Sequence, residues 1–183
     1  SPAPLPRADV PAIKVGDSWR WIRSDRRTGQ QEADTLRTVK SVSATTIEGE
    51  ENGGGYVQST SLALLETPEF KRSGDVRFLD FPLEVGKKWS FAFTQAGKTR
   101  PYERRWQYDT EVVAYEKVKV PAGEFDAFKI VSKGFWNSLR DKNSGSGTTI
   151  NWYAPAARGV VKTEYDEGRN STTTVLSEMQ LQP

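Results

Sequence analysis

Large aromatic residues alternate with polar residues along several segments of the chain, and this period of two constrains the fold more than any other feature. Trp19 and Trp21 lie on one face of a predicted strand, with Arg20 between them on the other. Successive side chains of a β-strand point to opposite faces, so alternation of this kind is typical of strands that bury one face. The same pattern recurs in Trp89, Phe91 and Phe93, and in Trp106, Tyr108, Thr110 and Val112.

Turn sequences separate the candidate strands. Asn52-Gly53-Gly54-Gly55 tolerates positive φ, Pro121-Ala122-Gly123 is typical of a tight turn, and the Gly- and Ser-rich residues 143–147 are predicted to form a flexible loop. No window combines helical apolar spacing with capping residues. The sequence therefore predicts an all-β fold, an antiparallel, strongly curved sheet or open barrel of about nine to ten strands with little or no helix. The remaining candidate strands are 35–42, 56–64, 125–133, 148–153, 160–165 and 172–181.

The chain of 183 residues has the length of one domain. We expect residues 1–13 to form an extended, proline-rich N-terminal tether and residues 14–183 to form a single β domain. The proline-rich start suits an exported chain whose signal peptide has been removed, with or without a lipidated Cys just upstream. No run approaches the roughly 18 apolar residues of a membrane helix, so we expect membrane contact only through such an N-terminal lipid anchor.

The sequence contains no Cys and no His. Disulfides, thiol nucleophiles, Cys/His zinc sites and Ser-His-Asp triads are therefore excluded within this chain. A metal would need oxygen ligands, but the acidic cluster Glu48, Glu50 and Glu51 lacks the spacing of a calcium loop and is predicted to be a solvated hairpin tip. No metal site and no cofactor are predicted.

The charges are numerous and nearly balanced, with 26 Lys and Arg against 24 Asp and Glu. Arg residues mingle with aromatic residues in 19–23 and 98–106. This is typical of grooves for single-stranded nucleic acid, and also of a β surface on which aromatic side chains face the core and Arg faces water. A net charge of +2 is too small to favour that function, so nucleic acid is not a predicted partner.

Pairs of carboxylates are the remaining route to catalysis, because a glycosidase needs only two acids beside a sugar bond. Nothing in the sequence separates the pKa values of any pair, so the chain is predicted not to be an enzyme, and a carboxylate-dependent hydrolase ranks third among the hypotheses. The candidate pairs are Asp80 with Glu84, Asp109 with Glu111, and Glu164 with Asp166.

A curved sheet with aromatic residues on its concave face could enclose an apolar ligand such as an acyl chain. Close packing of the same residues in a core is the alternative, since large aromatic side chains are the main core material that this sequence has. The candidate ligand-binding residues are Trp19, Trp21, Trp89, Phe91, Phe93, Trp106 and Tyr108.

One short sequence occurs twice. Both 14–21 and 84–91 read Val-Gly-x-x-Trp-x-aromatic, a turn that leads into an aromatic strand. The repeat indicates either a duplicated half or two independent uses of a common way to begin a strand.

Two segments carry a resemblance to known proteins. The first is Val118-Lys119-Val120-Pro121-Ala122-Gly123-Glu124-Phe125, continuing to Ile130, and the second runs from Trp152-Tyr153-Ala154-Pro155 to Lys162. They resemble uncharacterised bacterial secreted proteins and lipoproteins of the DUF3108-like kind and, more distantly, LolA/LolB-like lipoprotein carriers. This resemblance implies a curved antiparallel sheet and a location in the periplasm or at the periphery of the outer membrane of a Gram-negative bacterium.

The leading hypothesis is a non-catalytic binding domain of this compartment. It would hold an apolar or amphiphilic, lipid-like ligand, or an envelope protein as partner, on its aromatic-rich sheet face. The alternative is a structural or interaction module of an envelope assembly that pairs with its partner through a strand edge.

Overall fold

The computed structural model describes residues 2–183, and twelve strands dominate it. A single 3-10 turn, η1 (Pro155–Ala157), is the only helical element in this range. The strands are β1 (Ser18–Asp25), β2 (Gln31–Val42), β3 (Thr46–Glu51), β4 (Gly54–Ser59), β5 (Leu64–Glu66), β6 (Phe70–Gly74), β7 (Lys88–Gly97), β8 (Glu103–Val120), β9 (Gly123–Ser138), β10 (Ser144–Ala154), β11 (Gly159–Asp166) and β12 (Ser171–Gln180).

Each strand pairs antiparallel with its neighbours in chain order, and β12 pairs with β1 to close the sheet into a barrel. The prediction of an all-β antiparallel fold with little or no helix is confirmed. The predicted count of nine to ten strands is wrong, since the structure has twelve. The unpredicted strands are the acidic β3 and the short β5 and β6, which have only three and five residues and show no clear alternation. The barrel is closed rather than open. The sequence could not predict this closure, because pairing between the first and last strands leaves no local pattern.

The acidic segment around residue 50 is a strand and not the predicted hairpin tip. Ile47 and Glu51 lie on one face of β3, where Ile47 is buried and Glu51 forms an ion pair with Arg37 at 2.7 Å. The turn follows at Asn52 and Gly53, both of which have positive φ. The cluster of acidic residues predicted exposure to solvent. It could not indicate that Glu51 would pair with Arg37 of the neighbouring strand.

The segment 143–147 also differs from its prediction as a flexible loop. Ser144 begins β10, and Gly145 lies opposite Trp136 of β9. A β-carbon at residue 145 would overlap the Trp136 indole ring, so the glycine leaves space for that ring. The glycines of this segment therefore serve packing and not only flexibility.

The predicted turn at Pro121 is confirmed as the two-residue connection of the longest hairpin. Strands β8 and β9 have 18 and 16 residues and pair from Arg104 with Ser138 to Val120 with Gly123. Gly123 has a φ of 144°, a conformation that favours glycine.

The two copies of the Val-Gly sequence form the same turn. Gly16 has a φ of 96° and donates its N–H to Val39 of β2; Gly86 has a φ of 97° and donates to Val112 of β8. The turns precede β1 and β7, which are six strands apart in the twelve-strand sheet. The sequence repeat is thus a structural repeat at opposite sides of the barrel.

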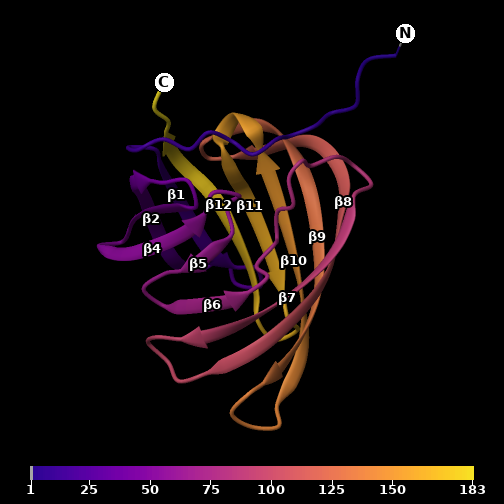
Figure 1. Ribbon diagram of the computed structural model, residues 1–183. Helices are drawn as coiled ribbons and strands as arrows, with labels where there is room; N and C mark the ends of the chain where they lie inside the picture. Colours follow the sequence, from indigo (N-terminus) through magenta and orange to yellow (C-terminus); the bar gives the residue numbers. More distant parts are fainter. Residues whose placement is uncertain (1) are drawn as a thin grey trace.

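Both ends of the chain lie at the same end of the barrel (Figure 1). Ala8 is buried there and exchanges two backbone hydrogen bonds with Leu83, at 3.0 and 2.7 Å. Ser1 of the predicted tether lies outside the described residues. Across residues 2–183, no helix is long and apolar enough to cross a membrane.

Candidate functional site

The interior of the barrel contains a cavity of about 1100 Å³. It is slightly larger than the roughly 300–1000 Å³ typical of small-molecule sites. The cavity reaches the surface at the end opposite the chain termini, where the exposed residues Arg100, Pro101 and Asn170 line it close to hairpin turns. The hairpins β7–β8 and β9–β10 extend at that end in Figure 1. A small molecule could therefore enter between the turns.

Stacked aromatic side chains form one wall of the cavity. Trp106 and Tyr108 alternate along β8 and stack with ring centroids 5.1 Å apart, and Phe93 of β7 stacks on Tyr108 at 6.0 Å. Tyr108 fits because Gly134, its cross-strand partner on β9, has no side chain to meet its ring. This wall offers apolar surface to a ligand.

The loop between β6 and β7, residues 75–87, closes the inner end of the cavity and is called the plug loop here. Its Phe78 packs edge-on against Phe91 and Tyr108, with ring centroids 4.9 Å apart in both pairs. Phe78 and the buried Leu79 both line the cavity. The plug loop thus separates the cavity from the end of the barrel that carries the chain termini.

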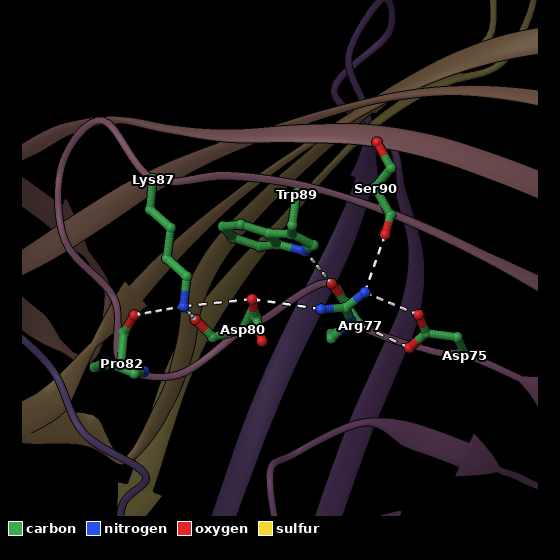
Figure 2. A network of polar contacts seen from close by, with 7 residues as sticks. All are labelled: Asp75, Arg77, Asp80, Pro82, Lys87, Trp89 and Ser90. Atoms are coloured by element: carbon green, nitrogen blue, oxygen red, sulfur yellow. Dashed lines mark hydrogen bonds and ion pairs between the residues drawn. The ribbon is translucent and has the colours of Figure 1, made fainter.

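Polar contacts within the plug loop, and between the loop and β7, fix its conformation (Figure 2). The Lys87 ammonium donates to the carbonyl oxygens of Asp80 and Pro82, at 2.7 and 2.9 Å, and forms an ion pair with the Asp80 carboxylate at 3.3 Å. The Trp89 indole N–H donates to the carbonyl oxygen of Arg77 at 2.6 Å. Because these contacts satisfy backbone groups of an irregular segment, they fix its path across the barrel.

The wall contributed by β10 to β12 is polar. Thr163 donates its hydroxyl to Asn151 at 2.7 Å, and the Tyr165 hydroxyl donates to the Glu167 carboxylate at 2.5 Å. Burial, together with Glu167, raises the pKa of Tyr165, so its hydroxyl stays protonated at neutral pH. Thr149, Thr172 and Thr174 add three more hydroxyl-bearing side chains to the lining. This side of the cavity can exchange hydrogen bonds with a ligand or with water.

Two arginines face the cavity beside the aromatic wall. Arg72 of β6 lies opposite Gln95 of β7, and Gln95 lies opposite Arg104 of β8. These three residues, called the arginine row, all line the cavity. Burial lowers the pKa of Arg72 to about 10, which still leaves its guanidinium charged at neutral pH. The row supplies two positive charges inside the barrel.

The seven predicted ligand-binding residues fall into three places. Phe93, Trp106 and Tyr108 line the cavity. Trp19 and Trp21 stack on each other and line a separate pocket of about 80 Å³. The other two, Trp89 and Phe91, pack against the plug loop in the core without lining the cavity.

Sequence reasoning missed the arginine row and the polar wall. Arg72 lies in a short strand that was not predicted, and Arg104 belongs to a cluster interpreted as outward-facing. The strand period carried a usable signal, because Arg104 has the same parity as Trp106 and Tyr108 on β8 and therefore shares their inward face.

None of the candidate carboxylate pairs faces the cavity. Asp80 lies against Arg77 and Lys87, and Glu84 forms an ion pair with Arg7. Exposed Asp109 accepts a hydrogen bond from the Ser90 hydroxyl at 2.6 Å. The remaining acids of these pairs, Glu111, Glu164 and Asp166, are also absent from the cavity lining.

The fold and the site together define a closed, twelve-strand antiparallel barrel with an internal cavity open at one end. A proposed lipoprotein of Parabacteroides distasonis shares this fold with a TM-score of 0.61 and 17% identity, over 94% of this chain and 99% of the other. A proposed exported protein with a YmcC-like fold from Bacteroides fragilis matches with a TM-score of 0.66 and 14% identity, over the same shares of the two chains.

At these identities the likeness concerns the fold. No protein-family model and no curated protein sequence matches the chain. The resemblance to DUF3108-like and LolA/LolB-like proteins stays a prediction.

Proposed function

We propose that the protein is a non-catalytic binding protein of the bacterial cell envelope that holds an amphiphilic ligand inside its barrel. The observation that carries the proposal is the cavity of about 1100 Å³, reached from one end and closed at the other by the plug loop. Barrels of about eight strands fill with side chains or hold one small ligand, and larger barrels enclose ligand cavities or channels. The cavity of this twelve-strand barrel is therefore the candidate ligand site.

The lining of the cavity favours an amphiphile over a wholly apolar molecule. Phe93, Trp106 and Leu79 offer apolar surface, whereas Asn151 and Thr163 present polar groups across the same space. Although Thr163 donates to the Asn151 amide oxygen, a hydrocarbon would leave the Asn151 amide nitrogen without an acceptor, at a cost of about 1–3 kcal/mol. A ligand with an apolar part and a polar part can meet both walls.

The envelope location rests on the two structures with the same fold, one a proposed lipoprotein and the other a proposed exported protein. Within the envelope, the periplasm or the periphery of the outer membrane of a Gram-negative bacterium is the proposed compartment.

The closed sheet also bears on the alternative of pairing through a strand edge. Both terminal strands of the sheet are used in the β1–β12 pairing, so no strand is left as an edge along its whole length. This observation favours the cavity over the sheet edge as the binding feature.

Native mass spectrometry tests the proposal on protein purified from the cells that make it. We expect a bound mass of a small amphiphile that disappears on denaturation. Thr174→Trp should remove that mass because Thr174 lines the cavity, whereas the adjacent Thr173→Trp should retain it because Thr173 does not. A bare protein mass in the natural protein, or equal loss in both variants, would contradict ligand binding in the cavity.

A further inference from the structure

The arginine row holds two guanidinium groups without a carboxylate partner. Among residues 2–183, neither Arg72 nor Arg104 forms an ion pair with an acidic side chain within 4 Å. The other charged residues of the lining are Arg23, Glu32, Glu69, Arg100 and Glu167; exposed Arg23 pairs with exposed Glu32 at 3.3 Å, and the Glu167 carboxylate accepts the Tyr165 hydroxyl. Arg72 and Arg104 therefore place positive charge without a paired carboxylate on the β6–β8 side of the cavity.

Neutral contacts fix the position of Arg72. Its Nε donates to Gln95 at 2.8 Å, its Nη1 donates to the carbonyl oxygen of Leu64 at 3.4 Å, and the Phe70 and Phe93 rings lie 4.5 and 5.0 Å from the guanidinium carbon. The described residues provide no hydrogen-bond acceptor for Nη2. Because a guanidinium has five N–H donors, the Nη2 edge remains available toward the cavity.

Similar contacts fix the neighbouring groups of the row. The Gln95 amide nitrogen donates to the Tyr102 hydroxyl at 2.8 Å, which orients its amide oxygen toward Arg72. Arg104 stacks on Trp136, with its guanidinium carbon 3.8 Å from the ring centroid. Stacking leaves the N–H groups at the guanidinium edge free to donate in the plane. Two preoriented donor groups thus flank Gln95 on one face of the sheet.

Arg72 and Arg104 line the same cavity from strands that are two apart. Neighbouring strands are roughly 4.8 Å apart, so the two residues are separated by about 10 Å at the backbone. A ligand that enters the cavity can therefore meet both guanidinium groups. A buried cation without an anion is costly, which makes an anionic ligand the natural partner for this arrangement.

We propose that the arginine row binds the acidic head group of the amphiphile, a carboxylate or a phosphate, while its hydrocarbon part lies along Trp106 and Leu79. This inference rests on the proposed function and specifies the class of ligand. Arg72 supplies its Nη2 edge, Arg104 supplies a second charge-assisted hydrogen bond, and Gln95 positions Arg72.

Isothermal titration of the purified protein with four twelve-carbon probes tests the inference: dodecanoate, dodecyl phosphate, dodecanol and dodecyltrimethylammonium, all below their micelle concentrations. We expect both anions to bind roughly tenfold to a hundredfold more tightly than dodecanol, and the cation to bind most weakly. Acetate, which lacks the chain, should bind at least about tenfold more weakly than dodecanoate. Equal affinity for acetate and dodecanoate would overturn the amphiphile as the ligand.

Substitutions of single arginines show which residues cause the preference for anionic probes. Arg72→Gln and Arg104→Gln should each reduce the preference about tenfold or more while they retain dodecanol binding. Arg105→Gln is the matched control, because Arg105 is the exposed neighbour on the opposite face of β8. If either Gln variant unfolds, Arg72→Lys and Arg104→Lys keep the charge and should keep part of the preference.

The outcomes separate the two proposals. Equal binding of all four probes would overturn the role of the arginine row and leave the binding cavity in place. Binding of none would overturn the proposed function itself. An equal loss of preference in Arg105→Gln and Arg72→Gln would overturn the assignment to the arginine row.

Discussion

The carboxylate of Asp17 and the guanidinium of Arg158 form an ion pair at 3.0 Å at the closed end of the barrel, with Asp17 fully buried. Asp17 also accepts the backbone N–H groups of Lys14 at 2.9 Å and Gln182 at 2.7 Å. One carboxylate therefore ties together the turn before β1, the connection from β10 to β11 and the C-terminal segment.

Asp17→Ala should lower the free energy of unfolding by about 3 kcal/mol, because it leaves buried donors and a cation without their acceptor. Urea denaturation measures this change. Asp9→Ala serves as control, since Asp9 belongs to an exposed ion pair with Arg7 and should change stability by less than about 0.5 kcal/mol. Equal effects of the two substitutions would show that Asp17 is not a structural link.

Gly134→Ala should destabilise the barrel by about 2 kcal/mol. A β-carbon at this position would overlap three atoms of the Tyr108 ring, and the stacked aromatic wall leaves the ring little room to move. Thermal unfolding should show a clear decrease in Tm. Gly55→Ala is the matched control, because no atom lies within 4 Å of its added methyl group; a Tm decrease as large in that variant would contradict the packing argument.

Lys87→Met should loosen the plug loop. The substitution removes both hydrogen bonds to the loop carbonyl groups and the ion pair with Asp80, at a cost of about 2 kcal/mol. Hydrogen exchange should become faster in residues 75–87, with smaller changes elsewhere. The adjacent Lys88→Met should leave exchange unchanged. Lys88 is largely exposed, and its ion pair with Glu111 is long, at 3.9 Å, and therefore weak. Unchanged exchange in Lys87→Met would mean that other contacts hold the loop.

Stability should fall in alkaline solution between about pH 9 and pH 11. Burial raises the pKa of Tyr56 to about 12 and also raises the pKa of Tyr108, Tyr153 and Tyr165. The unfolded chain releases these protons near pH 10, so it binds fewer protons than the folded chain and gains relative stability as the pH rises. Arg72 acts in the opposite direction, because its lowered pKa makes the folded chain release a proton first.

The four tyrosines lower the free energy of unfolding by more than Arg72 raises it, so the net loss of stability is about 3 kcal/mol near pH 11. Urea denaturation at about pH 9 and pH 11 measures it. Tyr56→Phe should reduce the loss by about 1 kcal/mol, and this variant should fold because the Tyr56 hydroxyl is buried without a hydrogen-bond partner. Stability that stays constant or rises over this interval would contradict the assigned burial of the tyrosines.

The sequence predicted the parts of the fold that are determined locally. Alternation along β8 placed Trp106 and Tyr108 on the inner face, and Pro121 marked the β8–β9 turn. Closure of the barrel could not be predicted in the same way, because β1 and β12 pair across nearly the whole chain. The charge at Glu51 obscured β3, since its inward position depends on Arg37 of the neighbouring strand.

The cavity itself was beyond sequence reasoning for a related reason. An aromatic side chain on an inner face can fill a core or line a space, and the difference depends on which residues face it from the other strands. Phe91 meets Phe78 of the plug loop, whereas Trp106 borders the cavity. Arg72 and Arg104 become a pair only through the registers of β6, β7 and β8.

The most direct test of the central claim is a crystal structure of the protein with 12-bromododecanoate, in which bromine gives an anomalous signal. We predict one bromine site inside the barrel near Trp106 or Leu79, with carboxylate density beside Arg72 and Arg104. Bromine bound only on the outer surface, or a cavity that stays free of the probe at saturating concentration, would contradict the account.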